Sequence, residues 1–294
     1  MAFKAWLLAR TLRPRRRFSG GGGSPCAALY PIDGIALAGS NLIASTARAR
    51  RKEELPSVAA RAAALDWAGI ALSLATQGCA TTGPLLAPNE CAALAGLYAQ
   101  EHGEGAPFRS RVIMARHGFG RGEYKYFAYP LPETVAALRA ALYPGLAEIA
   151  NRWNEALGIE ARYLAEHDAF LARCRKAGQG RPTPLLLQYG VGDYNCLHQD
   201  VYGELVFPLQ ATVLLSRPGE DFSGGEFVLT EQRPRMQSRA EVVPLGQGCA
   251  VIFAVRERPV QGTRGVYRVN MRHGVSRVRE GRRHTLGVIF HDAK

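Results

Sequence analysis

The segment LQYGVGDYNCLHQD, residues 187–200, carries the strongest signal for the fold and chemistry of this chain. It ends in His198-Gln199-Asp200. Side chains at positions i and i+2 of a β-strand point to the same side, so His198 and Asp200 can reach one metal ion. Further along the chain lie a third candidate ligand, His273, and an arginine ten residues after it, Arg283.

These residue types predict a particular kind of metal site. Two imidazoles and one carboxylate hold non-haem Fe(II) on one face and leave the opposite positions open. Arg283 begins an apolar segment that runs to Phe290, and a guanidinium buried there would pair with a carboxylate in bidentate fashion. We therefore predict an enzyme that activates O₂ with the help of a 2-oxo acid.

From about residue 184 to 292 the chain resembles the 2-oxoglutarate/Fe(II)-dependent dioxygenases. The His-x-Asp…His…Arg spacing is similar to that of prolyl-hydroxylase-like enzymes, whereas segment 187–200 resembles the one before the metal site of AlkB-type alkylation-repair enzymes. A fuller pattern resembles a prokaryotic branch proposed to oxidise damaged nucleic-acid bases. That pattern comprises YGELVFPLQ at 202–210, EQRPR at 231–235 and RHGVS at 272–276.

The resemblance implies roles for individual residues. His198, Asp200 and His273 would be the catalytic iron ligands, and Arg283 would bind the distal carboxylate of 2-oxoglutarate. The hydroxyls of Tyr189 and Thr285 would assist it. Two positions depart from the AlkB-type pattern, because Leu187 replaces an asparagine and Ile289 replaces a second arginine. The predicted co-substrate pocket is therefore closer to the prolyl-hydroxylase pattern.

The pattern of elements predicts a mainly β protein with α/β support at its N-terminal side. Beyond the breaker at 178–184, short strands alternate with Gly, Pro and Asp, which is typical of a jelly-roll, or double-stranded β-helix. Earlier, the sequence predicts helices at 57–75, 88–99, 132–157 and 159–176, a short strand at 78–83, and two strands around a Gly-rich turn at 108–127. The predicted organisation is a basic, disordered tail (1–55), a support region (56–179) and the oxygenase domain (180–294).

The positive charge is unevenly distributed. The formal net charge of the chain is +12. Residues 1–52 contain ten Lys/Arg and one Asp, and residues 231–283 contain twelve arginines and four glutamates. The second group predicts a basic rim that attracts phosphates. The alternative is that these arginines pair with acids or cover a solvated sheet face.

The sequence gives weaker indications about the substrate. Tyr124 and Tyr126 combine with neighbouring cations in a way suited to single-stranded nucleic acid, although both also fit ordinary strand packing. Arg233 and Arg235 lie in a polar segment that we predict to be a mobile substrate edge. Of the remaining histidines, His102 and His167 are expected at the surface, and His117, beside the glycine turn, could line a cleft.

We therefore predict hydroxylation of a C–H bond, in the form of oxidative demethylation of alkylated DNA or RNA bases, with damaged or single-stranded nucleic acid as the partner. The alternatives are a hydroxylase of protein side chains or free amino acids, and a catalytically silent barrel that binds nucleic acid or protein. The six cysteines are scattered, which indicates reduced thiols and a cytoplasmic location. No apolar run reaches the length of a membrane span.

Overall fold

The structure is a computed structural model that describes residues 56–103 and 105–294. The described residues belong to one compact unit, Glu53–Lys294. The basic tail predicted over residues 1–55 lies outside the described residues. No helix within the described ranges is both long and apolar enough to cross a membrane.

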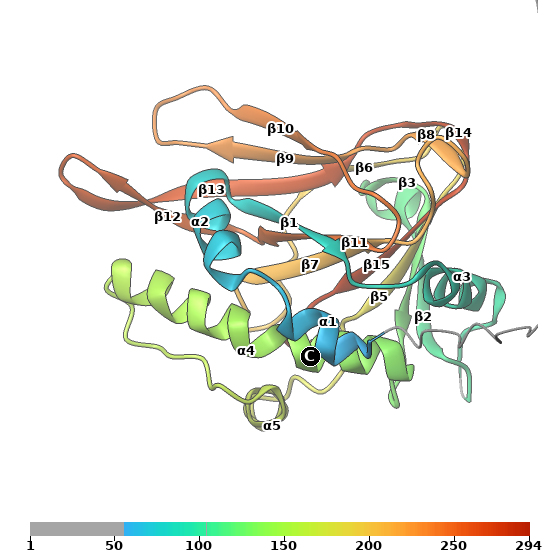
Figure 1. The fold of residues 1–294 in the computed structure, drawn as a ribbon, viewed down its shortest axis with the longest axis horizontal. Coiled ribbons are helices and arrows are strands. Elements are labelled where there is room, and N and C mark those ends of the chain that lie inside the picture. The colour runs from blue at the N-terminus through green and yellow to red at the C-terminus, as the bar shows by residue number, and fades with distance from the viewer. Residues whose placement is uncertain (1–55, 104) are drawn as a thin grey trace, which may run out of the picture. The chain divides into compact units, whose positions relative to one another are not determined.

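Two antiparallel sheets form the centre of this unit (Figure 1). The seven-stranded sheet has the order β1 (Cys79–Pro84), β11 (Cys249–Ala254), β7 (Leu209–Leu214), β15 (Arg283–Val288), β5 (Leu185–Tyr189), β4 (Glu123–Phe127) and β2 (Phe108–Ile113). The second sheet has the order β10 (Arg239–Val243), β9 (Phe227–Gln232), β13 (Gly265–Val275), β6 (Tyr194–His198) and β3 (Gly120–Arg121), with β12 (Glu257–Gly262) paired to β13. A small ribbon joins β8 (Phe222–Gly224) to β14 (Val278–Gly281). This arrangement confirms the predicted jelly-roll core.

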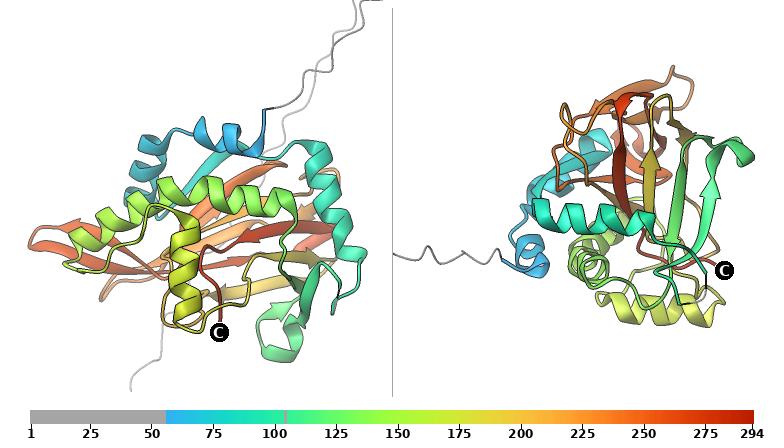
Figure 2. Two further views of the ribbon diagram at one scale, coloured as in Figure 1. Left: turned by 90° about the horizontal axis from the view of Figure 1, so that it is seen from below. Right: turned by 90° about the vertical axis from the view of Figure 1, so that its right-hand side faces the viewer.

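Helices cover the outer face of the seven-stranded sheet (Figure 2). They are α1 (Val58–Ala63), α2 (Trp67–Gln77), α4 (Glu133–Ala156) and α5 (His167–Lys176), with α3 (Pro88–Gly96), η1 (Leu97–Ala99) and η2 (Met114–His117) in the connections. The long helix α4 buries Leu138, Leu142 and Leu146 in the main apolar core. Because β7 lies between this helical layer and the second sheet, all six of its residues are buried.

Two predicted helices differ from the observed ones. The segment 57–75 forms two helices because the side chain of Asp66 accepts a hydrogen bond from the backbone N–H of Gly69 and caps α2. The helix predicted at 159–176 begins only at His167. Ahead of it, the side chains of Asn151 and Asn154 on α4 bond to the backbone of Tyr163 and Ala161, which holds that segment in a non-helical conformation.

Residues before position 180 take part in both sheets. Strands β1, β2 and β4 belong to the seven-stranded sheet, and β3 pairs with β6 in the second. The predicted support region therefore supplies strands as well as helices. The domain boundary near residue 180 stays a prediction.

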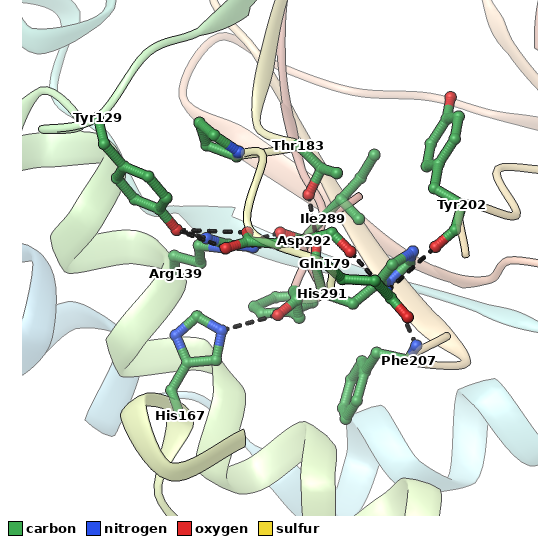
Figure 3. Close-up of polar contacts among 12 residues, drawn as sticks. Tyr129, Arg139, His167, Gln179, Thr183, Tyr202, Phe207, Ile289, His291 and Asp292 are labelled. Atoms are coloured by element: carbon green, nitrogen blue, oxygen red, sulfur yellow. Dashed lines mark hydrogen bonds and ion pairs between the residues drawn. The ribbon is translucent and has the colours of Figure 1, made fainter. Parts of the chain in front are cut away.

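A buried polar network ties α4 to residues 289–292 (Figure 3). Arg139 and Asp292 form an ion pair of 2.7 Å with both side chains almost fully buried, and Arg139 also donates to the backbone oxygen of Ile289. His167 bonds to the backbone oxygen of Phe290 at 2.8 Å. The prediction that His167 lies at the surface was wrong, because its ring packs against Tyr143 inside the core.

Gln179 belongs to the same network and fixes the loop that follows Asp200 (Figure 3). Its amide nitrogen donates to the backbone oxygens of Leu205 and Asp292, and its amide oxygen accepts from the backbone N–H of Leu205. A Cβ atom at Gly203 would lie 2.6 Å from the Gln179 side chain. The loop after Asp200 therefore packs closely against the buried side-chain amide of Gln179.

Candidate active site

A cavity of about 220 Å³ lies between the two sheets. Alternate residues of three neighbouring strands line its floor, as strand geometry requires. They are Leu185, Leu187 and Tyr189 on β5, Gln210 and Thr212 on β7, and Arg283, Thr285 and Gly287 on β15. The second sheet contributes His198 and His273 to the opposite wall. Residues that are far apart in the sequence, from both sheets, thus line the same cavity.

Three candidate metal ligands converge in this cavity. His198 is the last residue of β6 and is directly paired with His273 on β13. Asp200 reaches the same point from the segment just after the strand, and not from within it. Its carboxylate oxygens lie 3.5 Å from His198 Nε2 and 3.3 Å from His273 Nε2. The three ligand atoms lie within 4.8 Å of one another, close enough to hold one metal ion.

The hydrogen bonding orients these imidazoles for metal binding. His198 Nδ1 lies 2.8 Å from the backbone oxygen of Cys196, so this nitrogen donates and Nε2 keeps its lone pair on the side of Asp200. His273 also turns Nε2 toward the carboxylate. Two imidazole nitrogens and one carboxylate oxygen form a donor set that suits a first-row divalent metal such as Fe(II).

The three groups also shift one another's pKa values. Burial would raise the pKa of Asp200, but hydrogen bonds and charge from His198 and His273 lower it well below its ordinary value. Burial lowers the pKa of His198, yet its bonds to Asp200 raise it overall. For His273, burial and the neighbouring His198 lower the pKa. Asp200 is therefore ionised at neutral pH, as a metal ligand must be.

Arg283 is a buried cation in the same cavity. Only 2% of its surface is exposed, and burial lowers the pKa of its guanidinium to about 10, so it is still charged at neutral pH. One of its nitrogens donates to the hydroxyl of Thr285, and its guanidinium lies 5.6 Å from the centre of the Tyr189 ring. Within the described ranges no carboxylate forms an ion pair with it. A buried charge without a partner is costly, so this site is suited to an acidic ligand.

Several buried polar atoms along the cavity also have no partner among the described residues. They include the Tyr189 hydroxyl, the Gln210 amide oxygen and Arg283 Nε. Burial raises the pKa of Tyr189, so its hydroxyl stays protonated and can donate. Buried polar groups are nearly always hydrogen-bonded. The cavity floor is therefore suited to a polar ligand that carries a carboxylate.

Tyr202 is a residue of this site that sequence reasoning missed. Its hydroxyl donates to Asp200 Oδ1 at 2.9 Å and receives a hydrogen bond from the Tyr126 hydroxyl at 3.2 Å. The sequence carried two signals for it: the two-residue spacing from Asp200, and its place as the first residue of the YGELVFPLQ pattern. Tyr126, predicted to contact substrate, thus lies behind Tyr202, whereas Tyr124 lines the cavity.

The two arginines predicted at the substrate edge lie outside the lining of this cavity, and their role stays a prediction. Arg233 and Arg235 follow β9 and do not line the cavity. Arg233 Nε lies 2.7 Å from Glu231, and the buried Arg258 pairs with the same carboxylate. Arg239 approaches it to 3.7 Å. Three arginines of the predicted basic rim therefore share one carboxylate, so part of the rim pairs with an acid, as the alternative interpretation held, while the group keeps a net positive charge.

We expect Tyr202→Phe to weaken metal binding by about tenfold or more, because partners that orient metal ligands typically contribute 10- to 100-fold to affinity. Titration with Mn(II), followed by electron paramagnetic resonance, measures this without turnover. Tyr267→Phe removes a hydroxyl from a half-buried tyrosine of β13 outside the cavity and serves as the control. Equal Mn(II) affinity in both variants would show that the Tyr202 hydroxyl does not position Asp200.

The jelly roll, the His-Asp-His group and the buried arginine in one cavity define a metal-binding enzyme scaffold. The chain belongs to the Oxygenase-NA family, described as oxygenases catalysing oxidative methylation of damaged DNA, whose family model matches residues 122–293. The protein is thus an oxygenase.

The chain is also similar to individual proteins. Two uncharacterized proteins of Mycobacterium tuberculosis, from strains CDC 1551 / Oshkosh and ATCC 25618 / H37Rv, are each 50% identical over 167 residues, which is 57% of this chain and 72% of theirs. Similar solved structures include a Pseudomonas putida prolyl-4-hydroxylase (16% identity, TM-score 0.45, 78% of this chain and 99% of that one). Another is a 2OG-Fe(II) oxygenase family oxidoreductase from Burkholderia pseudomallei (16% identity, TM-score 0.46, 76% of this chain and 90% of that one).

Proposed function

We propose that this oxygenase uses Fe(II), 2-oxoglutarate and O₂ to hydroxylate a C–H bond of an alkylated nucleic-acid base. The observation that carries the proposal is Arg283, a buried cation with no carboxylate partner among the described residues, in the same cavity as the His-Asp-His group. A dicarboxylic 2-oxo acid that reaches the metal with one end would offer its other carboxylate to this guanidinium.

In this proposal each residue has a distinct task. His198, Asp200 and His273 hold the iron, and Arg283 binds the distal carboxylate together with the hydroxyls of Thr285 and Tyr189. When bound, the iron would catalyse oxidation of the C–H bond by O₂, coupled to decarboxylation of 2-oxoglutarate to succinate and CO₂.

Apolar side chains line part of the cavity wall. The apolar side chains of Leu185, Leu187 and Phe227 line it beside the polar groups. At the buried position of Arg283 its charge would act more strongly on a bound carboxylate than it would in water. This arrangement favours binding of the co-substrate in one orientation.

Two observations support a nucleic-acid substrate. The family is described as acting on damaged DNA, and Tyr124 brings an aromatic ring to the cavity wall. Burial raises the pKa of the Tyr124 hydroxyl, so this side chain is neutral at physiological pH. A neutral aromatic wall is suited to a planar base that has left its stack.

Succinate release in the presence of candidate substrates tests this function. We expect single-stranded oligonucleotides with N-methylated bases to stimulate release above the level seen with unmethylated oligonucleotides of the same sequence. Proline-rich peptides and free amino acids are assayed in parallel. Stimulation by peptides or amino acids alone would replace base oxidation with a side-chain or amino-acid hydroxylase.

A further inference from the structure

A half-exposed phenylalanine lies at the opening of the active-site cavity. Phe119 lines the cavity that contains His198 and Asp200, yet 47% of its surface is open to solvent. Val201, 42% exposed, lines the same cavity. Aromatic side chains that are left exposed beside a cavity are typical of binding sites. Sequence reasoning missed Phe119, because nothing in the segment distinguishes it from a core residue.

The backbone holds Phe119 in a fixed position relative to the candidate metal ligands. Its backbone oxygen accepts a hydrogen bond from the N–H of Cys196, on the strand that ends at His198. Gly120 follows with φ of 123°, and a Cβ atom there would lie 2.4 Å from the backbone oxygen of Tyr194. The glycine is therefore required for β3 to pair so closely with β6. This pairing places Phe119 beside the metal site.

A second ring supports Phe119. The imidazole of His117 stacks on it with a centroid distance of 5.3 Å and an interplanar angle of 23°. His117 is itself exposed and does not line the cavity. It is therefore linked to the opening only through Phe119, and the structure does not place it in the cavity lining as the prediction of a cleft position would require. Together the two rings form an aromatic platform, Phe119 and His117.

The segment around this platform is positively charged. Arg116 is exposed and has no ion-pair partner in the described part of the chain. Arg121, with its side chain 62% exposed, approaches Asp193 only to 3.9 Å. The other cations of the segment are engaged, since Arg111 pairs with Glu123 and Lys125 donates to the backbone oxygens of Tyr98 and Gln100. One arginine without an ion pair among the described residues, Arg116, and one exposed arginine in a long ion pair, Arg121, thus lie within a few residues of Phe119 in the chain.

We propose that Phe119, supported by His117, is a stacking platform for a base of single-stranded nucleic acid, and that Arg116 and Arg121 bind its phosphates. This inference rests on the proposed function and adds the specificity-determining residues at the opening of its cavity. Stacking on aromatic rings combined with phosphate contacts is how proteins hold single strands. A base within a duplex is already stacked on its neighbours and could not lie on this ring.

Binding of a short single-stranded oligodeoxynucleotide with one central 2-aminopurine tests the platform. The full chain is loaded with Mn(II) and 2-oxoglutarate, anisotropy gives the affinity, and 2-aminopurine fluorescence reports stacking. We expect Phe119→Ala to weaken binding by about tenfold or more and to remove the change in fluorescence. Phe119→Trp should preserve both. Leu72→Ala, a substitution of a 66% exposed residue of α2 away from the cavity, should bind like wild type.

The salt dependence separates stacking from charge. Arg116→Gln and Arg121→Gln should each reduce the slope of log K against log salt by about 0.7, whereas Phe119→Ala should leave that slope unchanged. The nine net positive charges of residues 1–52 are common to all variants and cancel in these comparisons.

Each failure has a distinct meaning. If the wild-type protein binds no single-stranded DNA, the nucleic-acid function itself is overturned. If it binds and Phe119→Ala binds equally well, only the platform is overturned. If Phe119→Ala weakens binding of a proline-rich peptide and not of the oligonucleotide, the occupant is a peptide and the inference fails.

Discussion

Asp200→Ala is expected to reduce succinate formation by at least about 10³-fold, because it removes one of the three proposed metal ligands and the only anionic one among them. Without the carboxylate, two imidazoles with ring centres 4.2 Å apart would face each other with nothing to balance a divalent cation. His198→Ala and His273→Ala should be similarly inactive. Mn(II) binding should weaken in all three variants, as measured by titration.

Glu204→Ala provides a matched control for the loss of the carboxylate. Glu204 follows Asp200 closely in the chain but is exposed, and among the described residues its carboxylate forms an ion pair with Lys294 alone, at 2.8 Å. Circular dichroism should show that the Asp200 variant keeps its sheets. Turnover near the wild-type level in Asp200→Ala would remove the residue from the metal site.

The second large effect is expected at Arg283. Leaving a buried carboxylate without its charged partner typically costs about 3–5 kcal/mol, which corresponds to a rise of about 10²- to 4 × 10³-fold in the 2-oxoglutarate concentration needed for half-maximal turnover. Arg283→Leu should show this rise. Arg283→Lys should recover only part of it, since an ammonium cannot bind a carboxylate in bidentate fashion.

Arg282→Ala is the control for Arg283, because Arg282 is the preceding residue and is exposed. Its substitution should leave the 2-oxoglutarate requirement within about twofold of wild type, as is usual for surface substitutions. A larger effect at Arg282 than at Arg283 would contradict the pairing of β15 with β5 that turns Arg283 inward beside Tyr189.

Much of the barrel and of the candidate metal site could be predicted from the sequence because both depend on local periodicity. In β15 the alternation of Arg283, His284 and Thr285 is enough to separate the cavity side from the other face, and the structure places Arg283 and Thr285 in the cavity. The spacing of His198 and Asp200 likewise brings two ligands together, although the strand ends between them.

The residues that the sequence did not reveal depend on contacts between distant segments. Tyr202 reaches Asp200 because the loop that follows Asp200 and leads to β7 is held by Gln179, which lies more than twenty positions earlier in the chain. His167 looks like a surface residue in a charged helix, yet it is buried by the backbone oxygen of Phe290 and the ring of Tyr143. Phe119 would read as a core residue without the pairing of β3 and β6. Such contacts have no short-range signature.

The buried amide of Gln179 has a consequence for how the protein tolerates change. Through its bonds to Leu205 and Asp292 it joins the loop after the candidate metal ligands to the residues paired with Arg139 on α4. A substitution on the helical side of the molecule is therefore expected to disturb the candidate metal site, although it contacts none of the three candidate ligands. A change at Arg139 should lower Mn(II) affinity at elevated temperature while the candidate ligands are intact, and such a defect would resemble the loss of a ligand.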